Sequence, residues 1–292
     1  MGRRALLAGE KLTYGLQRFG HSPVVLFDKL SGLVGDKQTV LAGDGIAYGE
    51  DERQRLDIWI PDAAGDAPLP VIIFFYGGGW TAGERREFGF VGRALAAKGF
   101  IAVLPDYRLA PQHRFPDFIL DGAAALKWVH DHVAGYGGDP SRIAVAGHSA
   151  GGHLAAMLTL NRRFAVEAGL PEGTIKAAAL LSAPTNFLPL NDERSFAALG
   201  SWPEPMETQP ISYARGDAPP IFFAHGTADI VVRCRNSQQL ARAIQERGGE
   251  VYIHLYRGEV HSDLVKSFSP LFRSSNPVLE DMTGFLSSLF DH

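Results

Sequence analysis

The residues best suited to covalent chemistry lie at positions 147–151, where the chain reads Gly-His-Ser-Ala-Gly. This stretch matches G-x-S-x-G, in which a serine on a sharp strand-to-helix turn exposes its hydroxyl as a nucleophile. Short matches are common in a glycine-rich chain, but here an apolar run at 142–146 precedes the motif and a helical pattern at 150–161 follows it. We therefore predict that Ser149 is a nucleophile. The alternative is a helix-capping serine in an ordinary turn.

A serine nucleophile needs a base, and the base needs a carboxylate that orients it. On a strand–turn–helix architecture the expected chain order is Ser, then Asp or Glu, then His. Asp229 follows an apolar run at 220–224, and His261 follows another at 250–255. Both positions fall just past the carboxyl end of a predicted strand, the sheet edge where Ser149 is also expected. We predict that Ser149, Asp229 and His261 form a catalytic triad.

Other histidines and aspartates compete for these roles. The histidines fall on the turn itself, on the helix after it, or beside or inside strands, where a hydrogen-bonded structural role is expected. The competing histidines are His148, His153, His225 and His254. Among the aspartates, Asp263 is too close to His261 in sequence to orient it, whereas Asp106 and Asp217 remain alternatives for the carboxylate.

Three consecutive glycines, Gly77 to Gly79, follow the apolar run at 71–75. Glycine loses more backbone entropy on folding than any other residue, so such a run indicates a place where bare backbone is needed. Acyl transfer creates an oxyanion that needs preset N–H donors, each worth roughly 3 kcal/mol. The N–H of Ala150, next to the nucleophile, is expected to supply one donor and the glycine loop the others.

The elements that must position these residues alternate between short apolar runs and longer helical patterns, which is typical of a mostly parallel sheet with helical crossovers. We expect strands at 39–48, 54–60, 70–75, 100–104, 142–146, 177–182, 220–224 and 250–255, and helices at 86–98, 116–134, 150–161, 235–247 and 277–290. The first two strands are expected to form an antiparallel, half-exposed hairpin.

Two segments fall outside this alternation. Residues 1–37 hold scattered apolar side chains, and we expect short helices there that contribute to a cap over a catalytic domain at 38–292. Residues 183–219 are rich in proline and aromatic residues, and an insertion of this length is more often a lid or pocket wall than an idle loop. A surface excursion with its own small core is the alternative.

Bulk composition describes an ordinary globular protein. Hydrophobic residues make up 46% and charged residues 21%, with 28 basic and 32 acidic side chains in no long run, so we expect no nucleic-acid partner. Cys234 is the single cysteine, which excludes an intramolecular disulfide and fits a reducing compartment. The apolar stretch at 5–8 is too short for a secretory leader, and no window of about 18 apolar residues suggests a membrane span. We therefore expect a cytoplasmic protein.

From about residue 45 to 290 the chain resembles the α/β-hydrolase superfamily, in particular its esterase/lipase branch. The resemblance rests on Gly147–Gly151, on Tyr-Gly-Gly-Gly-Trp at 76–80, and on Pro-Asp-Tyr-Arg-Leu-Ala-Pro at 105–111, which is similar to a segment of hormone-sensitive-lipase-like esterases. His-Gly-Thr-Ala-Asp at 225–229 and the late His261 complete it. It implies an α/β-hydrolase fold: a mostly parallel eight-stranded sheet with helices on both faces and a small cap or insertion.

The resemblance also implies roles for individual residues. The N–H groups of Gly78 and Gly79 would complete the oxyanion hole with Ala150, while Gly77 permits the turn. Hormone-sensitive-lipase-like enzymes have histidine before these glycines, whereas this chain has Tyr76. Tyrosine at this position is also similar to the carboxylesterase branch. The substitution therefore leaves the role of the glycines in the oxyanion hole intact, but it does not tell us to which of the two subfamilies the chain is more similar.

The expected activity is hydrolysis of carboxylic esters with a short to medium apolar acyl chain, without metal or other cofactor, because no metal-ligand spacing is present. Amide hydrolysis of the arylformamidase kind, and a ligand receptor on the same fold, are the alternatives. We expect a small-molecule ester as the substrate. The sequence does not decide whether the protein forms a homodimer. Candidate pocket walls are the aromatic residues Trp80, Phe88, Tyr107, Trp202 and Tyr213.

Overall fold

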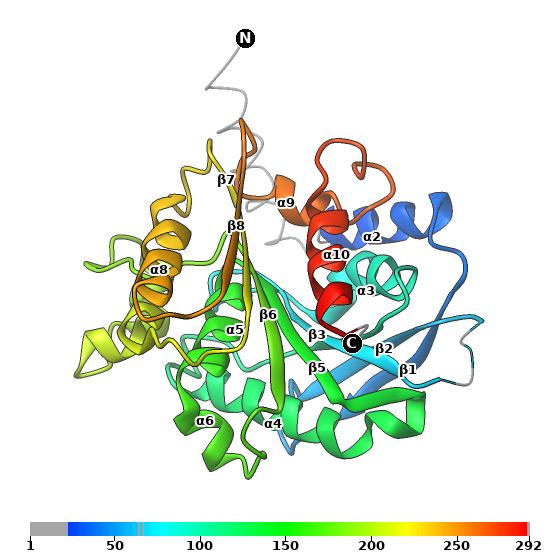
Figure 1. Ribbon diagram of the computed structural model, residues 1–292, viewed down its shortest axis with the longest axis horizontal. Helices are drawn as coiled ribbons and strands as arrows, with labels where there is room; N and C mark the ends of the chain where they lie inside the picture. Colours follow the sequence, from blue (N-terminus) through cyan, green and yellow to red (C-terminus); the bar gives the residue numbers. More distant parts are fainter. Residues whose placement is uncertain (1–22, 64, 66, 291–292) are drawn as a thin grey trace.

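The computed structural model describes residues 23–63, 65 and 67–290, which contain an eight-stranded sheet with helices packed on both faces (Figure 1). The strand order is β1-β2-β4-β3-β5-β6-β7-β8. The first three strands in this order pair antiparallel, and every later pairing is parallel. The strands are β1 (Thr39–Ala47), β2 (Arg55–Pro61), β3 (Leu69–Phe75), β4 (Ile101–Pro105), β5 (Gly138–His148), β6 (Ile175–Leu181), β7 (Ile221–Gly226) and β8 (Val251–Tyr256).

The predicted eight strands, the antiparallel entry hairpin and the α/β-hydrolase architecture are therefore confirmed. The central strands are buried along both faces, as their continuous apolar runs require: Val71 to Phe75 have no exposed surface. Strand β5 begins four residues earlier than expected, because Leu69 of β3 pairs with Gly138 before the apolar run starts.

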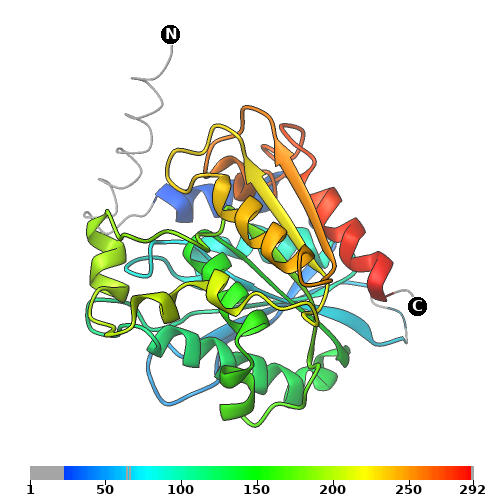
Figure 2. The same cartoon turned by 60° about the vertical axis from the view of Figure 1, so that its left-hand side comes forward.

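Two sets of helices cover the sheet. Figure 1 shows α3 and α10 on one face and α4 and α5 on the other, and the turned view in Figure 2 shows α8 packed along β7 and β8. The helices are α2 (Pro23–Val34), α3 (Gly89–Ala96), α4 (Asp117–His132), α5 (Ala150–Leu160), α6 (Arg162–Glu167), α7 (Glu193–Leu199), α8 (Arg235–Gln245), α9 (Asp263–Lys266) and α10 (Val278–Phe290).

The five predicted helices are present with shifted ends. The helix expected at 86–98 is divided into a 3₁₀ turn, η2 (Arg85–Phe88), and α3. The helix expected at 116–134 ends at His132 and passes into a 3₁₀ turn, η3 (Val133–Tyr136), which Gly137 closes with a left-handed φ of 81°. Within the described residues, no helix has the length and apolar character needed to cross a bilayer.

The two segments outside the alternating pattern have defined structure. Of residues 1–37, the structure describes those from Pro23 on, and they form α2 beside α3; the expectation for the first 22 residues lies outside the described part. The insertion at 183–219 contains α7 and two 3₁₀ turns, η4 (Pro205–Thr208) and η5 (Pro210–Tyr213). It packs on α5 through η5.

Candidate active site

Ser149 lies in the strained turn between β5 and α5. Its backbone has φ 55° and ψ −121°, a conformation that an L-residue adopts only when its surroundings impose it. Neighbouring glycines make the turn possible, because a Cβ atom at Gly147 would lie 2.3 Å from the Gly151 carbonyl oxygen. A Cβ atom at Gly151 would lie 2.1 Å from the carbonyl oxygen of Phe75. The motif at 147–151 therefore needs glycine at both positions.

The structure brings Ser149, His261 and Asp229 together in one hydrogen-bonded row. The Nε2 atom of His261 lies 2.9 Å from the Ser149 Oγ, and its Nδ1 atom lies 2.8 Å from the Asp229 Oδ2. Asp229 is 3% exposed and His261 6%, so both are screened from water. These distances are within hydrogen-bond range, and the order serine–imidazole–carboxylate is that of a nucleophile, its base and the group that orients the base.

Asp229 has hydrogen-bond donors at both of its carboxylate oxygens. Its Oδ1 accepts the backbone N–H groups of Val231 and Val232, each at 2.9 Å, and its Oδ2 faces His261 and, at 3.4 Å, the Nε2 of His225. Burial alone would raise the pKa of Asp229, but the hydrogen bonds from His225 and His261 hold that pKa well below its usual range. Asp229 therefore stays ionised beside His261.

The competing histidines near the site have structural partners. The ring of His148 bonds to the His261 backbone carbonyl at 2.9 Å. Burial and the nearby charge of His261 lower the pKa of His148 to about 3, so the ring is neutral and donates its Nε2–H to that carbonyl. His225 bonds to the Ser237 hydroxyl at 2.7 Å and to the Val232 carbonyl at 2.8 Å. Thus His148 fixes the backbone of the base, and His225 fixes the turn that carries Asp229.

The glycine loop lies directly against Ser149. A Cβ atom at Gly77 would lie 3.1 Å from the Ser149 Cβ, so a larger residue would crowd the hydroxyl. Gly78 and Gly79 have φ values of 150° and 62°. Among the described residues, no acceptor pairs with the backbone N–H of Gly78, Gly79 or Ala150. These N–H groups are therefore available to a ligand beside Ser149.

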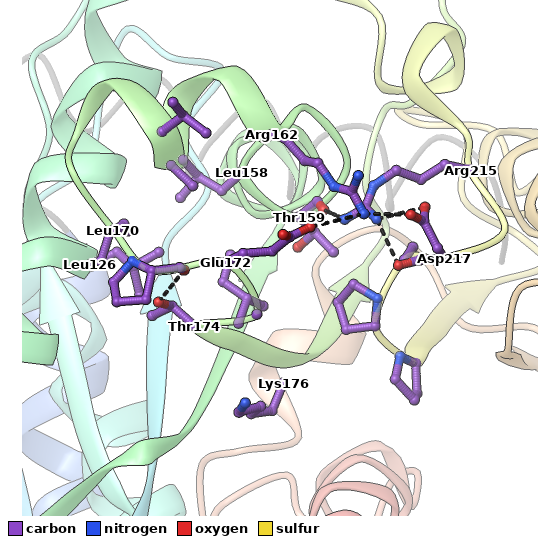
Figure 3. Close-up of a pocket in the computed structure, with 18 residues that line it drawn as sticks. Leu126, Leu158, Thr159, Arg162, Leu170, Glu172, Thr174, Lys176, Arg215 and Asp217 are labelled. Atoms are coloured by element: carbon purple, nitrogen blue, oxygen red, sulfur yellow. Dashed lines mark hydrogen bonds and ion pairs between the residues drawn. The ribbon is translucent and has the colours of Figure 1, made fainter.

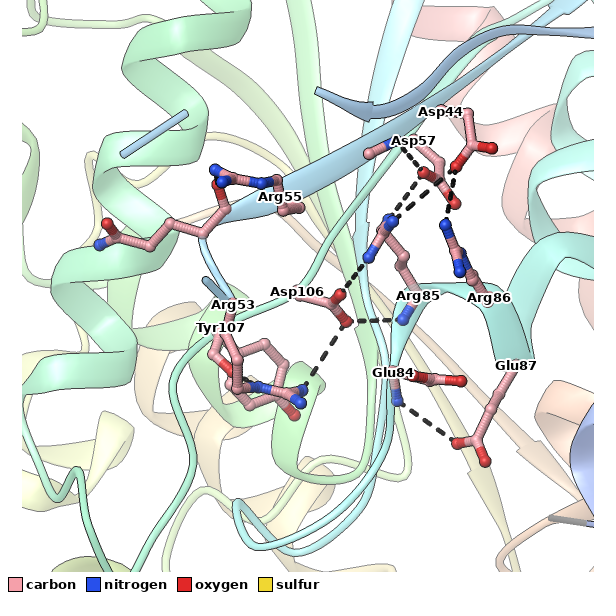
Figure 4. Close-up of polar contacts among 12 residues, drawn as sticks. Asp44, Arg53, Arg55, Asp57, Glu84, Arg85, Arg86, Glu87, Asp106 and Tyr107 are labelled. Atoms are coloured by element: carbon pink, nitrogen blue, oxygen red, sulfur yellow. Dashed lines mark hydrogen bonds and ion pairs between the residues drawn. The ribbon is translucent and has the colours of Figure 1, made fainter. Parts of the chain in front are cut away.

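Tyr76 connects the glycine loop to a polar network; Figure 4 shows the arginine and aspartate side chains of that network. Its hydroxyl donates to the Asp106 Oδ1 at 2.8 Å and accepts from the Arg53 guanidinium at 2.8 Å. Asp106 also accepts the Arg85 backbone N–H at 2.6 Å and its guanidinium at 2.7 Å, and the same guanidinium bonds to Asp57 at 2.7 Å. The ring of Tyr76 is fully buried. Tyrosine at this position therefore ties the loop to β2 and to the segment after β4.

Asp106, one of the carboxylate alternatives, belongs to this network and not to the triad. Its two oxygens bond to Tyr76 and Arg85. The other alternative, Asp217, is exposed and pairs with Arg162 and Arg215. Those ion pairs lie in a cavity of about 590 Å³ where β6 begins, at the sheet edge opposite Ser149, and none of the three triad residues lines it (Figure 3).

A pocket of about 580 Å³ opens beside Ser149 and His261. Its walls are mostly apolar and come from α2, the segment at 87–90 and the segment at 259–275. This size is within the range of small-molecule sites. The apolar residues that line it are Phe27, Ala82, Phe88, Phe90, Val265 and Phe272.

Only Phe88, of the five aromatic residues predicted as pocket walls, lines this pocket. Trp80 packs inside the core against His153 and Phe187. Tyr107 is buried against Tyr76 and donates its hydroxyl to the Tyr76 carbonyl. Trp202 and Tyr213 lie within the insertion and bond to Glu207, through its side chain and its carbonyl respectively.

The insertion at 183–219 likewise contributes no residue to the lining of this pocket. It is anchored to α5 instead, where His153 bonds to the Thr208 carbonyl at 2.8 Å. The residues that sequence reasoning missed, Phe27 and Phe272, come from segments far apart in the chain. Phenylalanine at either position follows no motif.

The described residues contain no group of three or more histidine, cysteine, aspartate or glutamate side chains arranged to hold a metal ion. Cys234 is a free, partly exposed thiol. The hydrogen-bonded row of Ser149, His261 and Asp229 supports nucleophilic attack by a serine hydroxyl on an electrophile held between the glycine loop and the start of α5.

Comparisons with known proteins identify the family of this chain. The BD-FAE family model matches residues 56–244, more than half of the chain. A probable isoprenylcysteine alpha-carbonyl methylesterase of rice, Oryza sativa subsp. japonica, is 32% identical over 81% of this chain and 60% of its own length. Esterase LipC of Mycobacterium tuberculosis is 34% identical over 68% of this chain and 54% of its own length. The chain thus spans between half and two thirds of these curated relatives.

Solved structures share the fold over nearly their whole length. Esterase 2 of Thermogutta terrifontis superposes with a TM-score of 0.70 and 26% identity, covering 86% of this chain and 96% of that one. Esterase B of Lactobacillus rhamnosis gives a TM-score of 0.78 over 99% of this chain and 97% of its own, at 21% identity. This chain, with its eight-stranded sheet and its serine at the turn after β5, belongs to the BD-FAE family of the α/β-hydrolase fold.

Proposed function

We propose that this protein is a serine esterase that hydrolyses carboxylic esters through an acyl-enzyme. One observation carries the proposal: a strained, pocket-facing Ser149 lies 2.9 Å from the Nε2 of His261, whose Nδ1 lies 2.8 Å from the ionised Asp229. Esterase activity is also in the names of the relatives and structural neighbours. The catalytic domain is assigned to residues 38–292, with α2 of the N-terminal segment completing the pocket.

In the first step, Ser149 Oγ attacks the ester carbonyl carbon while His261 Nε2 takes the hydroxyl proton. The tetrahedral intermediate then collapses, and the same proton passes from His261 to the leaving alcohol, which departs and leaves an acyl-serine. In the second step, His261 removes a proton from water, which attacks the acyl carbonyl. That proton then passes from His261 to Ser149 Oγ as the bond between the acyl carbon and Oγ breaks, and the acid leaves. Asp229 keeps the imidazole in the tautomer with the proton on Nδ1 and stabilises the imidazolium.

The oxyanion of each tetrahedral intermediate is assigned to the N–H groups of Gly78, Gly79 and Ala150. The basis is that these groups have no other acceptor among the described residues, that Ala150 follows Ser149 directly in the chain, and that Gly78 lines the pocket together with Ser149. Each such donor contributes roughly 3 kcal/mol to transition-state stabilisation in a site that excludes water. The buried Tyr76 network fixes the start of the loop and so keeps the donors in place before substrate binds.

The pocket favours an apolar ester. Phenylalanine rings dominate its wall, and the charged lining groups, Glu87, Glu259, Asp263 and Lys266, carry more negative than positive charge. A phosphate or dicarboxylate substrate would meet one cationic side chain in this wall, Lys266, against three acidic ones. We therefore assign carboxylic esters with an apolar acyl chain of short to medium length.

A series of p-nitrophenyl esters of increasing acyl length tests this proposal, with Ser149→Ala as the matched control. We expect turnover of the esters, with kcat/KM reduced by about 10⁴-fold or more in the variant, because loss of the nucleophile removes the covalent route. An N-formyl aromatic amine is the comparison substrate. Faster turnover of the amide than of every ester would contradict the proposal.

A further inference from the structure

An exposed apolar patch borders the mouth of the pocket. It consists of Leu30, Leu33 and Val34 on α2 together with Leu271 and Phe272 on the segment after α9, and all five are exposed. Leu33 is 71% exposed, which is high for a leucine next to a core helix. Globular proteins rarely leave contiguous apolar side chains in water, and where they do the surface marks an interaction site.

The two halves of the patch are joined structurally. The Ser31 and Ser269 hydroxyls lie 2.7 Å apart, and the rings of Phe27 and Phe272 lie 5.8 Å apart. Asp36, just after α2, forms a bidentate ion pair with Arg273 at 2.7 and 2.8 Å. Figure 1 shows α2 beside the loop that precedes α10. These contacts make α2 and the segment at 268–273 one surface.

Two phenylalanine side chains connect this surface to the pocket. Phe27 faces inward from α2, and it lines the pocket beside Ser149 together with Phe272. Phe272 is also 44% exposed, so one side chain belongs both to the pocket wall and to the patch. An apolar chain can therefore pass from outside the molecule to Ser149 along phenylalanine and leucine side chains.

On α2 and in the turn after it, the charged side chains that have no ion-pair partner among the described residues are positive. The two acidic side chains of this segment, Asp28 and Asp36, are paired with Arg93 and Arg273. Lys29 is exposed on the outer face of α2, one turn before Leu33, and Lys37 follows the helix. Among the described residues neither lysine has an ion-pair partner. Exposed leucines next to lysines are typical of helices that lie in a lipid headgroup layer.

We propose that the patch docks on an anionic lipid surface and that the substrates are amphiphilic esters whose apolar chain enters the pocket from that surface. The substrate half of this inference rests on the esterase activity proposed above, whereas the docking half does not. A lipid accounts for the continuity between patch and pocket, because a docked protein partner would cover the entrance. It also accounts for Lys29 and Lys37, which have no ion-pair partner within the part of the chain that the structure describes.

Sedimentation with vesicles tests docking independently of catalysis, because it can be measured on the inactive Ser149→Ala protein. Vesicles of phosphatidylcholine with and without phosphatidylglycerol are the probes. We expect binding that is stronger with phosphatidylglycerol. The substitutions Leu33→Ser and Val34→Ser together should weaken it about tenfold or more, since both side chains leave water on docking. Val166→Ser, which changes an equally exposed apolar side chain on α6, should leave it unchanged.

The kinetic arm uses the active protein with the same surface substitutions. We expect the Leu33→Ser, Val34→Ser variant to lose about tenfold in kcat/KM on a long-chain ester presented in vesicles. Its kcat/KM on dissolved p-nitrophenyl acetate should stay within about twofold of wild type, because neither residue lines the pocket.

Three results would overturn the proposal. The first is a folded Ser149→Ala protein that does not sediment with either vesicle. The second is equal vesicle binding by the Leu33→Ser, Val34→Ser variant. The third is a wild-type dimer that this variant converts to monomer, since the patch would then be an interface between two copies. If the protein binds vesicles but hydrolyses no ester, the proposed esterase activity is refuted, whereas the proposed docking surface is still supported.

Discussion

The change Tyr76→Phe tests what the tyrosine before the glycine loop contributes. Phenylalanine keeps the ring that stacks on Phe88 and Tyr107, with centroids 5.3 and 4.8 Å away, and removes only the hydroxyl. That hydroxyl makes two hydrogen bonds of 2.8 Å, one to the Asp106 carboxylate and one from the Arg53 guanidinium. A hydrogen bond to a charged group contributes about 1.5–3 kcal/mol.

The expected cost lies below the sum of the two bonds, because both partners keep other contacts. Asp106 retains the Arg85 guanidinium at 2.7 Å, and Arg53 retains the Gly83 carbonyl at 2.7 Å. We therefore expect Tyr76→Phe to lower the free energy of unfolding by about 1–3 kcal/mol. The backbone of residue 76 is held separately by the Tyr107 hydroxyl, so kcat/KM should fall by less than about tenfold.

Urea unfolding and ester hydrolysis measure these two effects, and a double-mutant cycle with Asp106→Asn isolates the coupling. We expect a coupling free energy of about 1 kcal/mol or more between the two changes. Tyr76→His, which restores the residue of hormone-sensitive-lipase-like enzymes, should cost more stability than Tyr76→Phe because it also loses the stacked phenol ring. A Tyr76→Phe protein as stable as wild type, with no coupling to Asp106, would refute this account of the network.

Three further changes test other parts of the structure. Arg85→Leu should lower the free energy of unfolding by about 3–5 kcal/mol in urea titrations, because it leaves two buried carboxylates without their guanidinium. Gly151→Ala should reduce kcat/KM on the order of 100-fold, since its Cβ would lie 2.1 Å from the Phe75 carbonyl oxygen and displace the nucleophile turn; unchanged kinetics would contradict the assigned turn. Burial lowers the pKa of His153 to about 4 in the folded protein. As the pH falls, the unfolded chain therefore binds a proton at this histidine at a higher pH than the folded protein does, and acid favours unfolding. Between about pH 6.5 and pH 4 this histidine should reduce stability by about 1.4 kcal/mol per pH unit, and His153→Gln should remove that part of the slope in urea unfolding.

The triad residues and the strands could be predicted because their signals are local. The apolar run at 71–75, the G-x-S-x-G turn and the residues just past β7 and β8 each follow from a few neighbouring positions. The sheet topology then brings these residues together in space, because the carboxyl ends of parallel strands meet at one edge of the sheet. For this reason Ser149, Asp229 and His261 could be placed together without any knowledge of long-range contacts.

The pocket could not be predicted in the same way. Trp80 and Tyr107 have the right residue type for a pocket wall, but an aromatic ring fits a core equally well, and here both rings are buried in it. Phe27 and Phe272 meet only because α2 packs against the segment that precedes α10. Contacts between segments this far apart leave no periodic pattern in the sequence.

Covalent labelling by a fluorophosphonate, followed by mass mapping of the modified residue, tests the central claim most directly. The account predicts one label per chain on Ser149, no label in Ser149→Ala, and much slower labelling in His261→Gln, because the hydroxyl then lacks its base. A folded wild-type protein that takes no label, or a label on another residue, would contradict the claim that Ser149 is an activated nucleophile.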